Sequence, residues 1–227
     1  MKPQHLLALF FLAAAALILF PIGDRNSSVF YVSLSFFLFA LLVSSSGTSF
    51  KNGLSQLGLL PDRKKLPSLL LWGIGAFFVS VAVAFCTSAV LYALGMLDTA
   101  PVQAKIVQLP PLAILIAVTL APLGEEALFR GLAFARFKGI ISRKNKKMNN
   151  AFATVALAAV FSSIIFAALH FSYGSAAEII AAFMIGLVFC AFTQKTGSLV
   201  PALVGHALFN LLSISATLVC ASGACPF

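Results

Sequence analysis

The residues of this sequence with the clearest capacity for chemistry are charged side chains in an apolar segment. Glu125, Glu126 and Arg130 lie in APLGEEALFRG at 121–131, and each charge costs about 2.5–3.5 kcal/mol at the centre of a membrane helix. Glu126 and Arg130 are four residues apart and can pair on one helical face. The helical period turns Glu125 about 100° away, which leaves it free for another role. Pro122 and Gly124 predict a kink that opens backbone or water access there.

Three further polar side chains interrupt apolar segments of the C-terminal half. His170 ends FAALH, one helical turn after Phe166, and His206 and Asn210 lie four residues apart in GHALFN. A spacing of four puts each pair on one helical face. Two of the three histidines and all three glutamates lie in this half of the chain, and two of those glutamates are adjacent. Their clustering favours a functional site.

Each polar element also has a purely structural interpretation. A single histidine in a membrane helix can be a packing residue bonded to a neighbouring carbonyl. The pair formed by Glu126 and Arg130 can hold two helices together, and Asn210 can join helices by a hydrogen bond. These interpretations stay open for each element taken alone.

The combination of side chains matches what hydrolysis of a peptide bond requires. One carboxylate takes a proton from water, and an imidazole positions that water or shares the proton. A second imidazole and an amide donate hydrogen bonds to the developing oxyanion. The elements that carry these groups must therefore bring several apolar helices together.

The whole chain has the composition of a membrane protein. Of its 227 residues, 61% are apolar and 9% are charged, and the mean hydropathy is +1.05. Soluble domains have about 45–50% apolar and about 25% charged residues. The composition excludes soluble enzymes and a separate nucleic-acid-binding domain. It predicts an all-α, polytopic integral membrane protein.

Seven apolar runs are long enough, or nearly so, to cross a bilayer, which takes roughly 20 residues per helix. The first run lacks the small-residue cleavage site of a signal peptide, so we interpret it as a span. Residues 51–67 predict a short interfacial helix that ends in a basic turn. The predicted spans are 5–22, 29–46, 68–97, 110–137, 151–173, 176–193 and 198–221.

The basic residues are distributed unequally between the two sides of the membrane that the seven predicted spans define. Twelve of the fifteen fall on one side, Arg25 and Lys105 fall on the other, and Arg130 lies in a span. Cytoplasmic loops are rich in Lys and Arg, so we expect a cytoplasmic N-terminus and an external C-terminus. The net charge of +9 is then a topology signal and not a nucleic-acid patch. The compact loops favour a bacterial plasma membrane. The twelve residues are Lys2, Lys51, Arg63, Lys64, Lys65, Arg136, Lys138, Arg143, Lys144, Lys146, Lys147 and Lys195.

Two cysteines fall on the tail that is expected outside. In an oxidising compartment, Cys220 and Cys225 are placed to close a small disulfide loop. The sequence contains no CxxC pair.

The predicted loops put Glu125 and His170 at different depths. Glu125 lies 11 residues from Arg136, whereas His170 lies 19 residues from Ala151, a mismatch of about 12 Å. A shared site requires the fifth helix to begin inside the cytoplasm or to tilt, or the fourth helix to break near Pro122.

The three motifs resemble a known family in order and spacing. EEALFR at 125–130 matches EExxxR, FAALH at 166–170 matches FxxxH, and HALFN at 206–210 matches HxxxN. They are similar to the CPBP family of CAAX-protease and bacteriocin-processing intramembrane endopeptidases, also called Abi proteins, which includes the eukaryotic type II CAAX prenyl protease.

The resemblance covers residues from about 101 to 215, and LSQLGLLP before the third span matches loosely. It implies a catalytic region at 101–227, in which four helices enclose a cavity within the membrane. Residues 1–100 would form an N-terminal region of three helices and the basic interfacial segment.

Carried over position by position, the resemblance implies a role for each motif residue. Glu125 would be the base that activates water, aided by His170. Glu126 and Arg130 would shape and neutralise the site, and Phe166 would support it. Every motif position carries the residue type of the family, so nothing marks the chain as catalytically dead.

The resemblance also implies an oxyanion hole formed by His206 and Asn210. We favour a mechanism without metal or other cofactor, because no HExxH is present and Asn210 suits an oxyanion donor better than a zinc ligand. If a divalent metal such as zinc were bound, its ligands would be Glu125, His170 and His206.

The residues and the resemblance together predict an intramembrane endopeptidase. Its partners would be the lipid bilayer and a peptide or lipid-modified protein substrate, and the sequence indicates no oligomeric state. One alternative is a non-proteolytic immunity or scaffold protein. A proton-coupled transporter is less favoured, because a relay through Glu125 should reach both membrane faces, and the polar residues of the first three spans are mainly Ser and Thr.

Overall fold

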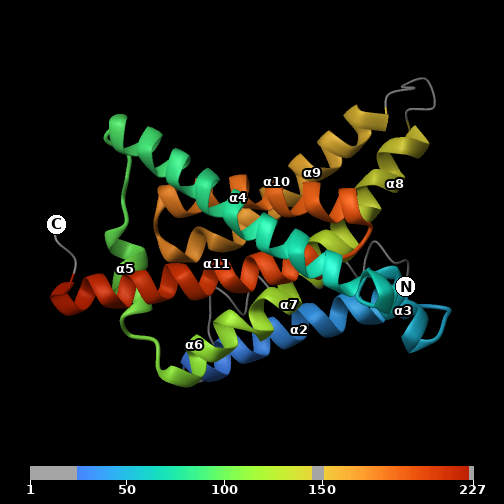
Figure 1. Ribbon diagram of the computed structural model, residues 1–227, viewed down its shortest axis with the longest axis horizontal. Coiled ribbons are helices and arrows are strands. Elements are labelled where there is room, and N and C mark those ends of the chain that lie inside the picture. Colours follow the sequence, from blue (N-terminus) through green and yellow to red (C-terminus); the bar gives the residue numbers. More distant parts are fainter. Residues whose placement is uncertain (1–24, 145–150, 225–227) are drawn as a thin grey trace.

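The protein is described here by a computed structural model that covers residues 25–144 and 151–224. These residues form helices and no strand, which confirms the all-α prediction. In Figure 1, α2 (Arg25–Ser45) and α11 (Val200–Val219) run roughly along the long axis of the molecule, and α4 (Leu66–Ala93), α8 (Ala135–Lys144) and α9 (Ala151–Leu169) are inclined to it. The first predicted span, 5–22, lies outside the described residues.

Five helical segments are long and apolar enough to cross a membrane, and the count is six if a bent pair of helices forms one more span. This confirms a polytopic membrane protein, but the count of seven is not confirmed. The five segments are Arg63–Ala93, Pro111–Arg143, Ala151–Tyr173, Ala176–Thr196 and Val200–Ala224.

The bent pair consists of α2 (Arg25–Ser45) and α3 (Phe50–Gln56). A bend of 106° separates the two helices. Ser49 is the N-cap of α3, because its hydroxyl accepts a hydrogen bond from the Asn52 N–H at 3.3 Å. The chain therefore has a short helix at the start of the predicted 51–67 segment.

The loop after α3 is hydrogen-bonded to the C-terminal half of the chain through the carbonyl of Gly58. This oxygen accepts hydrogen bonds from the Leu199 N–H at 3.0 Å and the Ser198 hydroxyl at 3.1 Å. Gly58 has φ of +77°, and a Cβ there would lie 3.1 Å from the Leu199 nitrogen. Glycine is therefore favoured at this position by both conformation and space. The loop lies against the start of α11 (Val200–Val219).

The predicted fourth span is not one straight helix. It begins as α6 (Pro111–Val118), breaks at Thr119, where φ is −117° and ψ is −69°, and resumes as α7 (Leu120–Glu126). Pro122 explains the break, because it has no N–H to donate to the carbonyl four residues earlier. The break therefore precedes the predicted kink by one helical turn.

A π-helix, η2 (Ala127–Phe134), follows α7, and all eight of its residues are buried. The chain then continues as α8 (Ala135–Lys144). The span predicted to end at 137 therefore remains helical to Lys144. π-Helical turns are rare and are frequent at functional sites.

The length of α8 corrects the expected depth mismatch. Helix α8 packs against α9 (Ala151–Leu169), which leads into the 3-10 turn η3 (His170–Tyr173). Glu125 lies 19 residues before Lys144, and His170 lies 19 residues after Ala151. The expected mismatch was wrong because helix continues where a loop was predicted, so the same number of residues separates Glu125 and His170 from the two ends of the connection between α8 and α9.

Helix α7 lies close to α2 at Gly124, where an added Cβ would overlap the carbonyl oxygen of Ser33. We expect Gly124→Ala to lower the free energy of unfolding by about 1–3 kcal/mol, because a backbone carbonyl cannot move aside as a side chain can. Thermal unfolding in detergent measures this effect.

The matched control for this prediction is Gly139→Ala in α8, where an added Cβ has no atom within 4 Å. That substitution should leave the melting temperature unchanged or raise it. Equal melting temperatures for the two variants would contradict close packing at Gly124.

Helices α4 (Leu66–Ala93), α10 (Ala176–Thr196) and α11 pack against one another. A Cβ on Gly205 of α11 would lie 2.9 Å from the Cβ of Ala76 on α4. Small residues thus allow these helices to approach closely, as is common between membrane helices.

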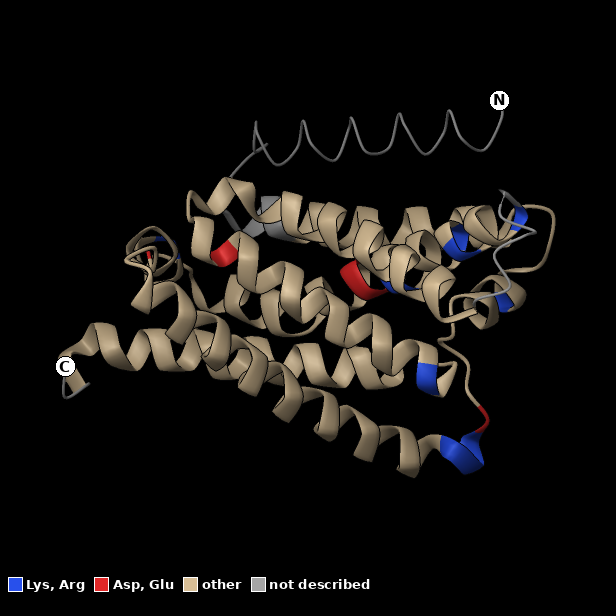
Figure 2. Cartoon of the chain, turned by 90° about the horizontal axis from the view of Figure 1, so that it is seen from above, with Lys and Arg blue, Asp and Glu red and all other residues tan. Residues whose placement is uncertain are grey.

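Most basic residues gather at one end of the molecule, as Figure 2 shows. This basic end is formed by the 3-10 turn η1 (Arg63–Lys65), α8 and the end of α10. The opposite end is formed by α5 (Ala100–Ile106), a short helix that the sequence did not reveal, and by η3. The charge asymmetry is thus a property of the folded chain.

At the opposite end, Asp98 caps α10 from a loop far away in sequence. Its Oδ1 accepts hydrogen bonds from the Ala177 N–H at 3.0 Å and the Ser175 hydroxyl at 2.9 Å, and its Oδ2 accepts one from the Ala176 N–H at 3.1 Å. These bonds, that of Ala177 first, hold the pKa of Asp98 below its usual value of 3.8.

This cap predicts a dependence of stability on pH. A carboxyl group with a lowered pKa in the folded state stabilises the fold fully above its unfolded pKa, and this contribution is lost as pH falls through the folded value. We therefore expect the melting temperature of the wild type to exceed that of Asp98→Asn at neutral pH. The difference should shrink between about pH 5 and about pH 2. A difference that stays constant over this range would contradict the assignment.

Candidate active site

One cavity of about 680 Å³ brings together the four residues predicted to be catalytic. Glu125 lies on α7, His170 begins η3, and His206 and Asn210 lie on α11, and all four line this cavity. The three motifs therefore meet in one place, on three different membrane-spanning segments.

A chain of polar contacts joins two of the motifs. Arg130 Nη1 donates a hydrogen bond to Glu126 Oε1 at 3.1 Å, and the same oxygen lies 2.8 Å from His206 Nδ1. On the other side of the ring, His206 Nε2 lies 3.7 Å from Glu125 Oε2. The imidazole of His206 therefore lies between two adjacent glutamates.

The two glutamates differ in their access to the cavity. The Glu125 side chain is 24% exposed, whereas the Glu126 and Arg130 side chains are fully enclosed. Only Glu125 of this pair lines the cavity. It is therefore the carboxylate that can meet water or substrate.

The contacts of His206 constrain how it can donate a hydrogen bond. An ionised carboxylate only accepts hydrogen bonds, so Nδ1 carries the proton in the contact with Glu126. A neutral ring would then leave Nε2 as an acceptor. A hydrogen bond from Nε2 to an oxyanion in the cavity requires a proton on that nitrogen as well.

The guanidinium of Arg130 is held between aromatic rings. Its central carbon lies 4.3 Å from the ring centre of Phe166 and 5.5 Å from that of Phe189. A Cβ on Gly186 would lie 3.2 Å from Arg130 Nη2, so a glycine on α10 makes room for the buried cation. Cation–π contacts and the ion pair with Glu126 offset its loss of hydration.

His170 is oriented by its own helix. Its Nδ1 donates to the Phe166 carbonyl at 3.0 Å, which leaves Nε2 as an acceptor in the neutral ring. The Phe166 ring packs edge-on against His170 at 4.8 Å and against His206 at 6.1 Å. Phe166 therefore separates and positions both imidazoles and the guanidinium.

Asn210 reaches the cavity beside the break in the fourth span. Its Nδ2 donates to the Ala117 carbonyl of α6 at 2.9 Å. An amide nitrogen carries two hydrogens, so one remains for an oxyanion. The contact also joins α11 to α6, as the structural interpretation of this residue predicted.

The residues suggested as possible zinc ligands do not form a metal site. Among residues 25–144 and 151–224, no three His, Cys, Asp or Glu side chains are grouped so that they could hold a metal ion. This includes Glu125, His170 and His206.

Sequence reasoning missed several residues that position the site. Phe189 stacks on His206 at 5.2 Å with an angle of 26° between the rings, and Gly186 makes room for Arg130. Ser162, on α9, donates to the carbonyl of Phe129 in the π-helix at 2.8 Å. Each is an ordinary residue of an apolar helix, so the sequence contains no signal that distinguishes it.

Part of the chain matches the model of a known protein family. Residues 107–212 match the family model described as type II CAAX prenyl endopeptidase Rce1-like. No curated protein and no solved structure matches the chain. The matched range includes all three motifs.

Proposed function

Residues 107–212 belong to the type II CAAX prenyl endopeptidase Rce1-like family, and from this premise we propose that the chain is an intramembrane endopeptidase with Glu125 as its base. The family implies a peptidase that acts in a membrane. The observation that carries the assignment is the position of Glu125, which lines the cavity beside His206, while Glu126 is enclosed and paired with Arg130.

The proposed reaction needs only side chains of this site. Glu125 accepts a proton from water while the water oxygen attacks the carbonyl carbon, and His170 Nε2 accepts the second hydrogen bond of that water. The carbonyl oxygen becomes an oxyanion that His206 and Asn210 stabilise by hydrogen bonds. Glu125 then gives its proton to the leaving nitrogen as the carbon–nitrogen bond breaks. Glu126 and Arg130 act through His206 by holding its ring.

We propose a membrane-associated peptide, or the terminus of a lipid-modified protein, as substrate. The family suggests this class, and the cavity lies among segments long and apolar enough to cross a membrane. We also propose a bacterial plasma membrane with the N-terminus in the cytoplasm. Two features support this orientation: the basic end of the molecule (Figure 2) and the disulfide bond of Cys220 at the opposite end. The predicted partner of Cys220, Cys225, lies outside the described residues.

The test in cells is to replace the wild type by Glu125→Gln and identify membrane peptides by mass spectrometry. Uncleaved substrates should accumulate in the variant, because a glutamine cannot take the proton of water. If Glu125→Gln and His170→Ala both leave the cellular phenotype and the peptide pool unchanged, the protease assignment is wrong, and the scaffold alternative gains support.

A further inference from the structure

The cavity continues beyond the candidate active site toward the opposite end of the molecule. Its lining there includes Thr99 and Gln103, which are both exposed, together with Tyr173 and Glu178. None of its lining residues comes from η1, α8 or the turn between α10 and α11 at the basic end. The cavity therefore reaches the surface region around α5 and η3.

The charge of this lining is one-sided. Three carboxylates, those of Asp98, Glu125 and Glu178, line the cavity, and no Lys or Arg does so among the residues whose side chains the structure describes. The nearby Lys105 is engaged elsewhere, because its ammonium donates to the Ser172 carbonyl and lies 5.4 Å from the Tyr173 ring centre. A substrate in this part of the cavity therefore meets the carboxylates of Asp98 and Glu178.

The three carboxylates differ in the hydrogen bonds and ion pairs that they form within the protein. The Asp98 carboxylate accepts three hydrogen bonds at the start of α10, and Glu125 belongs to the candidate active site. The carboxylate of Glu178 has no hydrogen bond or ion pair with any described residue. It is thus the acidic group with unused capacity to bind.

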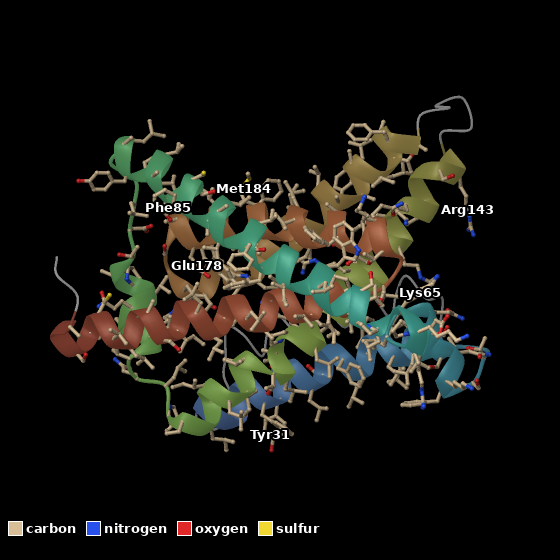
Figure 3. All side chains as sticks on the ribbon, in the orientation of Figure 1. Tyr31, Lys65, Phe85, Arg143, Glu178 and Met184 are labelled. Carbon is tan, nitrogen blue, oxygen red and sulfur yellow. The ribbon has the colours of Figure 1, made fainter. Side chains whose placement is uncertain are left out.

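The sequence offers a structural role for Glu178 that the fold does not use. Ser175 and Glu178 have the spacing of a capping box, in which the glutamate side chain returns to the backbone N–H of the first residue. Here the Ser175 hydroxyl does accept a bond from the Glu178 N–H at 3.0 Å. Among the described residues, no bond from the Ser175 N–H to the Glu178 carboxylate is present. The next two N–H groups, those of Ala176 and Ala177, donate to Asp98. Figure 3 shows Glu178 within the bundle, away from Lys65 and Arg143 at the basic end.

The face of α10 that carries Glu178 leads directly to the candidate active site. Ala181, Ala182 and Ile185 continue the lining along this face, and Phe189 further on stacks against His206. The separations of seven residues to Ile185 and eleven to Phe189 correspond to about 10 Å and about 16 Å of helix. An extended peptide covers about 3.3 Å per residue, so this distance is spanned by about three to five substrate residues.

We propose, on the basis of the proposed function, that Glu178 is a specificity-determining residue that binds a basic side chain of the substrate. The Lys or Arg lies about three to five residues from the bond that is cleaved. A carboxylate without a partner, in a partly enclosed site with apolar walls, gains a charge-assisted hydrogen bond from such a group. Small side chains on α10 leave room for the intervening residues.

The test compares binding of matched peptides to the full-length chain in detergent. The probes are fluorescent, N-acetylated, Leu-rich decapeptides with one Lys four residues from the centre, on either side, and the same peptides with norleucine in place of Lys. The Glu125→Gln background prevents cleavage during the measurement. At least one Lys peptide should bind about tenfold more tightly than its norleucine counterpart.

The preference for Lys should disappear in Glu125→Gln/Glu178→Gln and should reverse in favour of a Glu-containing peptide in Glu125→Gln/Glu178→Lys. The matched control, Glu125→Gln/Asp62→Asn, removes a carboxylate from the exposed cap of η1 and should keep the preference. Equal affinities for the Lys and norleucine peptides in the Glu125→Gln background would overturn the proposal. So would a Lys preference that survives Glu178→Lys.

Cleavage of the same peptides by the wild type separates this proposal from the proposed function. If the wild type binds the Lys peptide through Glu178 but cleaves none of the peptides, the endopeptidase assignment fails and the basic-residue site stands. If it cleaves Lys and norleucine peptides equally and binds them equally, the endopeptidase assignment stands and the role of Glu178 is overturned.

Discussion

Glu125→Gln is expected to reduce kcat/KM for a cleaved membrane peptide by about 10²–10⁴-fold, the usual contribution of a general base. The glutamine has nearly the same size but cannot accept the proton of the attacking water. The substitution should also disturb the fold little, because the Glu125 side chain is partly exposed and its Oε2 lies 3.7 Å from His206 Nε2, which is too far for a hydrogen bond. Hydrolysis should fall while the melting temperature stays close to that of the wild type.

The matched control is again Asp62→Asn, which neutralises a carboxylate at the basic end of the molecule. It should leave kcat/KM within a factor of about two, because a screened surface charge has little effect at this distance. Retention of more than a third of the activity in Glu125→Gln would show that another group activates the water. Initial rates with a quenched fluorescent peptide in lipid vesicles give both values.

Arg130→Met is expected to cause the largest loss of stability, about 3–5 kcal/mol, because it leaves a buried carboxylate without its cation. The side chains of Arg130 and Glu126 have no exposed area, and Glu126 then keeps only its contact with His206. The methionine is apolar and unbranched, so it fills much of the space between Phe166 and Phe189. Unfolding of the purified chain in mixed detergent micelles measures the change.

A second substitution distinguishes the charge from the packing. Adding Glu126→Gln to Arg130→Met removes the uncompensated charge and should restore part of the lost stability. Arg130→Lys keeps the charge but loses the planar group that packs on Phe166, and it should give an intermediate loss. The effect of Glu126→Gln on the free energy of unfolding is measured twice, once in the wild type and once in Arg130→Met. If Glu126→Gln lowers stability equally in both, the two residues do not stabilise each other.

Much of the site follows from spacing along single helices. The pair of Glu126 and Arg130 forms across one helical turn, as their separation of four residues predicts. Glu125 faces away from that pair and lines the cavity, as the helical period requires. The all-α membrane architecture follows from composition and from apolar runs of the length of a span.

Features that depend on contacts between distant segments were not predictable in the same way. The contact of His206 with both glutamates joins residues 80 or more positions apart, and nothing local to either helix determines it. The break at Thr119 and the π-helix that follows Glu126 have no composition signal, although Pro122 indicates a break nearby. The end of the fourth span was predicted too early because the charges of α8 suggested a loop.

The hydrogen bonds to the carbonyl of Gly58 have a consequence for how the chain is made. They join residues 140 positions apart, so at about 5–20 residues per second the ribosome needs roughly 7 to 28 s to supply Ser198 after Gly58. Throughout this time the loop after α3 lacks its final partner. Synthesis of the turn between the last two spans therefore completes the hydrogen bonds of a loop that was made much earlier, and a chain stalled before Ser198 should present this loop to proteases.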